Sequence, residues 1–420
     1  MDRKTLAERI SPTLKGQLLA LLIIAITVTG TALRIYAANR LPVDNDERVY
    51  LQTAVQYNNY IRQGRWGMLT VDDINSEHPV FYKVVYGAAL LSRPHLEKLD
   101  KADFVLGMSI AKVNARPWGL TARYVSVMSG GLTTLALSMI NPLAGLFFAT
   151  DTLAVKYGSS IFLEALPLLA NLLAAICYLR WYQGIRCQPQ RENLIWLGLS
   201  ACFMGGSVAC KYTYAVVGIT ITIHFVGSVV LKKAPARALW KLAAWGMLSV
   251  AVFFACDPYL WRHTFSRLSL TIAYHQNHSQ SDEVLKYNYP FWQPLVWLSA
   301  SFPHFFDNSR TSFLVRPDAL IALLALAGLP RLFHRQPFYF IWLVTALAVL
   351  LLYPVKWPQY TMIAIVPLCL SAAMGTGWLF DLLKGGLVFF CEAGEKRNRM
   401  LFTAERSGNK LLKMPGDYCC

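Results

Sequence analysis

The chain has 420 residues, of which 55% are hydrophobic and only 15% are charged, and its mean hydropathy is positive at +0.37. A soluble domain of this length does not need so much apolar surface, so the composition excludes an ordinary soluble protein. The net charge of +16 does not indicate a nucleic-acid-binding protein, because Lys and Arg stand mainly in the connections between apolar runs.

Recurring apolar runs predict about ten membrane-spanning helices, because roughly 20 apolar residues cross the hydrocarbon core of a bilayer as a helix. Many Trp and Tyr residues stand at the ends of these runs, as an interfacial belt requires. The sequence therefore predicts an all-α polytopic membrane protein. The expected spans are 18–36, 120–140, 143–157, 163–180, 194–210, 212–230, 239–256, 313–329, 338–353 and 360–380.

The distribution of basic residues predicts the orientation of these spans. Lys and Arg gather before the first span, near 180–191, 232–237 and 331–335, and again in the C-terminal tail. If the chain spans the membrane about ten times, an even number, all of these basic clusters lie on one side. The positive-inside rule identifies that side as the cytoplasm. Both termini are therefore expected in the cytoplasm.

Two long segments, 37–118 and 257–312, are then expected on the non-cytoplasmic side, and they are named the first and the second external segment. The first contains an apolar stretch, 80–91, that is too short to span the bilayer comfortably and predicts an interfacial or re-entrant helix. The expected division of the chain is a cytoplasmic N-terminus (1–17), a transmembrane domain (18–383) and a cytoplasmic tail (384–420).

Charged residues of both signs are expected at the external border of the membrane. The cations are Arg123, Lys156, Lys211 and Lys356, and the acids are Asp44, Asp46, Glu47, Glu77 and Glu164. A snorkelling interface residue is the simpler explanation for any single Lys. Charged side chains that separate helices bring to one membrane depth cost free energy. The set as a whole therefore favours a site for an anionic lipid phosphate.

The external border also carries a series of short motifs. Residues 44–50 (DNDERVY) follow the first span directly, and residues 77–79 (EHP) precede the apolar stretch. Together these two resemble the GT-C superfamily of membrane glycosyltransferases, in the branch of protein O-mannosyltransferases and bacterial lipid A aminoarabinose transferases. Further motifs are similar to that branch and come in its order: 122–126 (ARYVS), 160–165 (SIFLEA), 205–213 (GGSVACKYT), 257–261 (DPYLW) and 356–360 (KWPQY).

The sequence also departs from the family pattern. Val80 replaces the usual second Pro after His-Pro, and Glu164 replaces the more common Asp. The sequence contains no WWDYG-type motif, and no C-terminal soluble domain of the kind that oligosaccharyltransferases carry is expected. The identity of the acceptor therefore stays open between protein, lipid and glycan.

The resemblance implies a GT-C fold and a glycosyltransferase that moves a sugar (mannose or a related sugar) from a polyprenyl-phosphate donor to a hydroxyl acceptor, with inversion, on the non-cytoplasmic face. It assigns the catalytic base to Asp46. Without the resemblance, Asp44, Asp46 and Glu47 indicate only an acidic turn that caps a helix beginning near Val49. A transporter or flippase of lipid-linked sugars is the alternative, although the sequence shows no inverted repeat.

The resemblance also implies roles for the other candidate residues. Glu47 and Glu77 are expected to position the substrate, and His78 to bind the phosphate or to close a turn. Arg123, Lys211 and Lys356 are candidate phosphate ligands, with Lys211 the strongest. Glu164 and Tyr360 complete the substrate-binding set.

The remaining expectations concern cofactors, partners and location. A divalent cation held by Asp46 and Glu164 stays open, but the branch resembles the metal-independent members, so no cofactor is expected. The pair His275 and His278 has metal-ligand spacing without a third ligand, and it is more often metal-free. Expected partners are the lipid-linked sugar, the acceptor and membrane lipid, with no nucleic acid. A bacterial or archaeal cell membrane is favoured over the endoplasmic reticulum.

Overall fold

The computed structural model describes residues 12–71, 74–187, 193–300 and 313–406. The first and last residues of the expected cytoplasmic segments, 1–11 and 407–420, lie outside this description. Regular secondary structure in the described residues is entirely helical, apart from one isolated bridge between Pro42 and Ser109. The all-α fold predicted from the sequence is confirmed.

The first membrane helix leads directly into a pair of helices in the segment that is expected outside the cytoplasm. Helix α1 (Pro12–Ala38) is followed by α2 (Asn45–Arg62) and α3 (Phe81–Ala89), which pack against each other. The Glu47 carboxylate accepts a hydrogen bond from the backbone N–H of Asp44 at 3.0 Å. This contact satisfies an orphan donor at the start of α2 and fixes where the helix begins. Helix α3 lies within the apolar stretch for which an interfacial helix is expected.

The expected span 143–157 is not a single helix. It is divided into α5 (Pro142–Thr150) and α6 (Thr152–Tyr157), with Asp151 between them. The Asp151 carboxylate accepts from the N–H of Ala154, and Asp318 accepts from the N–H and hydroxyl of Thr152, all at 2.8 Å. Two carboxylates thus accept hydrogen bonds from donors at the N-terminus of α6. These bonds make the start of a new helix more favourable than the continuation of α5.

The other helices follow in chain order. The membrane-domain helices are α4 (Arg116–Ile140), α7 (Ala165–Cys187), α8 (Leu194–Val208), α9 (Val216–Val230), α10 (Leu239–Cys256), α14 (Asp318–Arg335), α15 (Pro337–Leu352) and α16 (Met362–Arg406). The second external segment forms α11 (Thr264–Ser279), α12 (Asp282–Tyr287) and α13 (Gln293–Ser299). Short 3₁₀ turns connect them at η2 (Trp66–Thr70), η3 (Leu90–Ser92), η4 (Ile110–Lys112), η6 (Tyr212–Ala215), η7 (Ala236–Ala238), η8 (Pro258–Trp261) and η10 (Pro358–Thr361).

Five helices of the described chain are long and apolar enough to cross a membrane by themselves: Thr13–Ala38, Ala165–Arg186, Tyr212–Val230, Ala236–Cys256 and Pro358–Lys384. Shorter apolar helices lie at Phe81–Ser92, Leu194–Val208 and Pro337–Leu352. These helices make the chain a polytopic membrane protein. The count of ten spans and the cytoplasmic position of the termini stay predictions.

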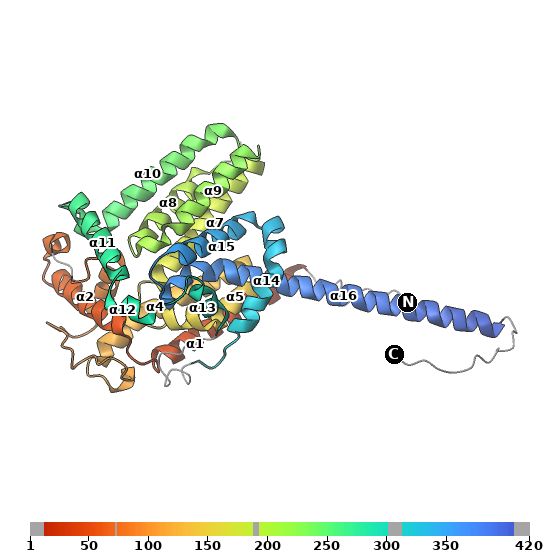
Figure 1. Ribbon diagram of the computed structural model, residues 1–420, viewed down its shortest axis with the longest axis horizontal. Coiled ribbons are helices and arrows are strands. Elements are labelled where there is room, and N and C mark those ends of the chain that lie inside the picture. Colours follow the sequence, from red (N-terminus) through yellow and green to blue (C-terminus); the bar gives the residue numbers. More distant parts are fainter. Residues whose placement is uncertain (1–11, 72–73, 188–192, 301–312, 407–420) are drawn as a thin grey trace.

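The two external segments lie at the same end of the molecule. Figure 1 shows α2, α11 and α12 together at one end, opposite the end from which α16 extends. Helices α14 and α16 cross closely, because Gly328 and Gly375 carry no side chain at the contact. The helix bundle thus brings chain segments that are about 200 residues apart in sequence to one end of the molecule.

Candidate functional site

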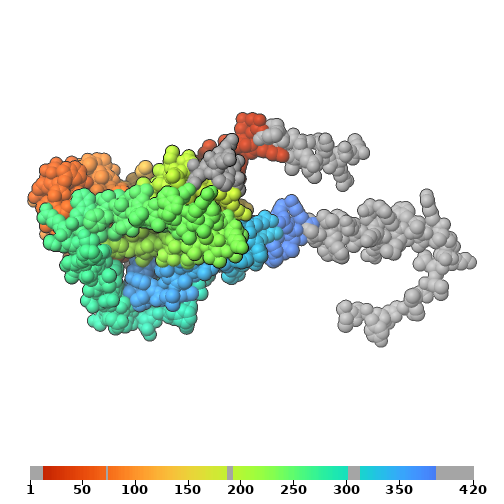
Figure 2. Space-filling view, turned by 90° about the horizontal axis from the view of Figure 1, so that it is seen from above, coloured from red at the N-terminus to blue at the C-terminus, as the bar shows by residue number. Residues whose placement is uncertain are grey.

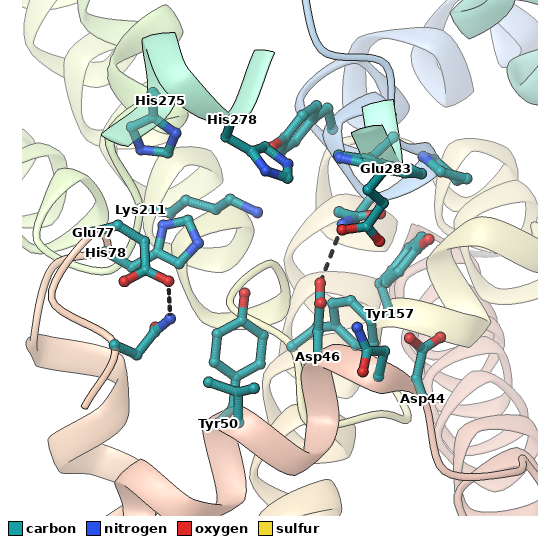
Figure 3. Close-up of a pocket in the computed structure, with 18 of the residues that line it drawn as sticks. Asp44, Asp46, Tyr50, Glu77, His78, Tyr157, Lys211, His275, His278 and Glu283 are labelled. Atoms are coloured by element: carbon teal, nitrogen blue, oxygen red, sulfur yellow. Dashed lines mark hydrogen bonds between the residues drawn. The ribbon is translucent and has the colours of Figure 1, made fainter. Parts of the chain in front are cut away.

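A polar cavity of about 370 Å³ lies at this end of the molecule. Its walls come from the start of α2, the loop before α3, the α8–η6 junction, helices α11 and α12, and η10. The polar and aromatic side chains that line it include Asp44, Asp46, Tyr50, Glu77, His78, Tyr157, Lys211, Tyr274, His275, His278, Glu283, Tyr287, Trp357, Gln359 and Tyr360. Of the residues expected from the sequence, Asp46, Glu77, His78, Lys211 and Tyr360 meet here (Figure 3).

Asp46 lies in the first turn of α2 and points into the cavity. Its carboxylate accepts a hydrogen bond from the side-chain amide of Gln359 at 3.3 Å (Figure 3). Burial, together with the negative charge of Asp44, raises the pKa of Asp46 to about 7, against a smaller opposite effect of Lys211. A carboxylate with this pKa can accept a proton near neutral pH and release it again.

The pKa of Asp44, two residues earlier, is shifted in the opposite direction. Its carboxylate bonds the Lys156 ammonium at 2.7 Å. Burial by itself would raise the pKa of Asp44, but the charge and hydrogen bond of Lys156 more than offset this, so the pKa falls below its usual value. Two carboxylates of one turn are therefore pushed apart in pKa, which is a common arrangement where one group accepts a proton and the other stays ionised.

Glu47 and Arg123, both expected to bind substrate, pair with each other outside the cavity. The Arg123 Nη2 to Glu47 Oε2 distance is 2.6 Å, and both side chains are completely buried. Arg123 also donates to the carbonyl oxygens of Ala38 and Leu41, at 2.7 and 2.9 Å. The pair therefore ties α4 to the connection between α1 and α2, and so fixes the turn that carries Asp46.

Lys211 lines the cavity and is paired from behind by Glu164, which does not line it. The ammonium also lies 5.0 Å from the centre of the Tyr360 ring, a cation–π distance. Burial raises the pKa of Glu164, and Lys211 partly offsets this effect. Glu164 thus anchors the lysine at the wall of the cavity.

Glu77 and His78 stand on a loop that a buried lysine holds in place. The Lys83 ammonium donates to the carbonyl oxygens of Asn75 and His78, at 2.6 and 2.8 Å. The Glu77 carboxylate accepts from the side-chain amide of Asn75 (Figure 3). Lys83 is not among the site residues predicted from the sequence, because a lysine inside an apolar stretch gives no indication of the loop that it closes.

Lys356 is not brought to the cavity. Its ammonium donates to the carbonyl oxygens of Leu350, Leu351 and Tyr353, at the end of α15. These carbonyls have no partner within the helix, and a cation there is favourable. The described contacts of Lys356 are therefore those of a helix C-terminal cap.

The second external segment supplies cavity residues that the sequence analysis did not place in the site. Helices α11 and α12 contribute Tyr274, His275, His278, Glu283 and Tyr287. The spacing of His275 and His278 puts both on one face of a helix. No sequence pattern indicated that this helix folds over the Asp46 turn, some 230 residues away in the chain.

An apolar groove of about 550 Å³ adjoins the polar cavity. Its wall includes Val216 and Ile219 of α9, Leu268 and Ile272 of α11, and Val349 of α15. Figure 2 shows the surface hollowed between the teal stretch of the second external segment and the blue C-terminal helices. Four residues line both spaces and so mark their boundary: His78, Lys211, His275 and Tyr360.

The donor atoms do not fit a divalent cation held by Asp46 and Glu164. Glu164 bonds Lys211 and lies outside the cavity lining. Across the described ranges, no three His, Cys, Asp or Glu side chains are grouped as metal ligands. Metal independence itself stays a prediction.

Comparison with known proteins gives a fold and no close relative. No protein-family model and no curated protein matches the chain. A crystal structure of ArnT from Cupriavidus metallidurans bound to undecaprenyl phosphate superposes with a TM-score of 0.52, over 89% of this chain and 63% of that one, at 16% identity. The chain has a GT-C fold.

Two other solved structures align at lower similarity. Apo ArnT from the same organism gives a TM-score of 0.49 at 15% identity, over 90% of this chain and 64% of that one. The oligosaccharyltransferase AglB from Archaeoglobus fulgidus, in complex with an inhibitory peptide and a dolichol-phosphate, gives 0.48 at 11% identity, over 89% and 52%. The chain thus spans less than two thirds of the length of these GT-C proteins.

Proposed function

We propose that this protein is a glycosyltransferase that moves a sugar, mannose or a related one, from a polyprenyl-phosphate donor to a hydroxyl acceptor on the non-cytoplasmic face. The observation that carries the proposal is the boundary between the polar cavity and the apolar groove, where Lys211 stands. An amphipathic donor lipid needs such a pair of spaces, one for the sugar and one for the first units of the polyprenyl chain. The GT-C fold shared with ArnT, crystallised with undecaprenyl phosphate, supports the same substrate class.

Asp46 is the proposed general base. The acceptor hydroxyl gives its proton to the Asp46 carboxylate while its oxygen forms a bond to the anomeric carbon of the sugar. The bond between that carbon and the phosphate oxygen breaks, and its electron pair leaves with the polyprenyl phosphate. Attack from the face opposite the phosphate inverts the anomeric centre. The pKa of about 7 suits a base that works near neutral pH.

Lys211 is the proposed electrostatic partner of the leaving group. Negative charge on the bridging oxygen grows as the bond breaks, so a fixed ammonium stabilises the transition state more than the ground state. Glu77, which lines the cavity, is proposed to bind sugar hydroxyls, and the aromatic rings of Tyr360 and Trp357 are proposed to offer apolar faces to the sugar. Arg123, Glu47 and Glu164 support the site through the contacts described above, whereas Lys356 caps the end of α15.

The test is transfer by the purified protein in liposomes that contain a defined polyprenyl-phosphate sugar. A glycosyltransferase releases free polyprenyl phosphate in an amount equal to the glycosylated acceptor. A transporter or flippase moves the intact lipid between leaflets and releases none. Translocation of intact donor lipid without any release, in the presence of a broad set of hydroxyl acceptors, would overturn the proposal.

A further inference from the structure

The helix that covers the site carries a histidine at the boundary of the two spaces. His275, on α11, lines both the polar cavity and the apolar groove, whereas His278, one turn later, lines only the polar cavity. Figure 3 shows both rings reaching from α11 over Lys211 and His78. The first and second external segments therefore meet at the point where a lipid phosphate has to lie.

The surroundings of His275 suit a phosphate ligand. Its ring centre lies 5.8 Å from that of His78, and the side chain is half-buried, so the ring is held but still accessible. The backbone of Glu77 lies beside the ring and raises the pKa of His275, so it favours the protonated form of the ring. His275, His78 and Lys211 all line the boundary of the two spaces, so the ring of His275 borders the same space as the Lys211 ammonium (Figure 3).

The charge of the ring depends on what fills this space. Burial lowers the pKa of His275, the Glu77 backbone opposes this, and His278 and Lys211 lower it further. An anionic phosphate beside the ring has the opposite effect, because it stabilises the imidazolium. In that form a ring N–H donates a charge-assisted hydrogen bond to a phosphate oxygen.

We propose that His275 is a direct ligand of the donor-lipid phosphate, contributed by the second external segment across the site from Lys211. The inference rests on the proposed function and adds a residue that the motif resemblance does not assign. Lys211 and His275 then hold the phosphate from two sides. The sugar extends into the polar cavity and the lipid into the groove.

The test compares His275→Phe with His278→Phe, two matched changes three residues apart on one helix. Binding of undecaprenyl phosphate to the purified protein is the readout, with the melting temperature and elution profile as checks of folding. We expect His275→Phe to weaken binding roughly 10- to 100-fold, as for the loss of one hydrogen bond to a charged group. His278→Phe should stay within about threefold of wild type, since that ring does not reach the groove. His275→Gln, which keeps one N–H donor, should recover part of the affinity.

The outcomes separate this inference from the proposed function. If wild type binds undecaprenyl phosphate and His275→Phe binds it equally well, His275 is not a ligand, although the proposed function stands. Equal losses in the two Phe variants would also overturn the inference, because they would indicate a general disturbance of α11. If wild type itself does not bind the lipid, the proposed function fails.

Discussion

The two acidic residues at the start of α2 show how a side chain's neighbours set its chemistry. Asp44 and Asp46 share one turn, yet Lys156 keeps the first ionised while burial raises the pKa of the second to about 7. The motif resemblance singled out Asp46 as the base, but only the contacts show why it differs from Asp44. The same turn is held in place by the buried pair Glu47–Arg123.

This difference predicts a specific pH dependence. Below pH 7 Asp46 is protonated and cannot accept a proton, so kcat/KM should fall about tenfold per pH unit there and level off above pH 7. Asp44→Asn removes the neighbouring charge that raises the pKa, and it frees Lys156, so the acid limb should move to lower pH. A pH–rate profile of the two proteins measures this. An acid limb that stays in place in Asp44→Asn would show that another group titrates.

Lys211 and Lys356 are a matched pair for testing the phosphate site. Each change to Met removes an ammonium and keeps most of the apolar stem. Lys211→Met should lose affinity for the donor lipid and, more strongly, turnover, because negative charge grows on the bridging oxygen. Lys211→Arg should recover only part of both, since a planar fork does not replace a compact ammonium.

Lys356→Met provides the control for this prediction. It should leave donor binding nearly unchanged and lower the melting temperature, because it removes the cap of α15. Donor-lipid titrations and thermal unfolding curves distinguish the two effects. A Lys356→Met variant that loses donor binding while Lys211→Met keeps it would reverse the assignment.

At the scale of helices, close crossings hold the walls of the site in place. A Cβ added to Gly328 of α14 would lie 1.8 Å from the Ser371 carbonyl oxygen of α16, whereas Gly198 of α8 has no neighbour within 4 Å. Gly328→Ala should therefore lower the melting temperature clearly, because the backbones must separate. Gly198→Ala should be neutral or slightly stabilising, since Ala favours a helix by up to ~1 kcal/mol over Gly. Equal melting temperatures would contradict the crossing.

The sequence predicted helices better than it predicted their interruptions and contacts. Apolar runs indicate a helix, but they do not reveal that Asp151 and Asp318 divide the expected span 143–157 by capping a new helix start. Charge at the membrane border predicted Lys211 and Lys356 alike. Tertiary packing sets which ammonium faces the cavity. Lys211 is paired with Glu164 at the cavity wall, whereas Lys356 bonds carbonyl oxygens at the end of α15.

At the scale of the molecule, the order of motifs along the chain was enough to predict the GT-C fold and the meeting of Asp46, Glu77 and Lys211. It was not enough to predict the contribution of α11 and α12, because no motif covers their cavity residues. A resemblance carried by short motifs can place only the residues within them. The remaining wall of the site follows from how the second external segment folds back.

The orientation of the whole molecule gives a further prediction. Both termini and the connection near Lys232 should lie in the cytoplasm, and the loop near Asn288 should lie outside, because basic residues favour the cytoplasmic side. Single Cys residues introduced at these two positions in a Cys-free background measure this by labelling of intact cells with a membrane-impermeant reagent. Labelling at 232 and protection at 288 would show the reverse orientation and would place the cavity in the cytoplasm.

The most direct test of the central claim is single-turnover transfer by Asp46→Asn, with saturating polyprenyl-phosphate sugar. The change keeps the shape of the side chain and removes its basicity, so donor binding should persist while the rate of transfer falls by ~10²–10⁴. Release of polyprenyl phosphate should fall by the same factor as formation of the glycosylated acceptor. Wild-type rates in this variant, with the donor bound normally, would contradict the assignment of Asp46 as the base.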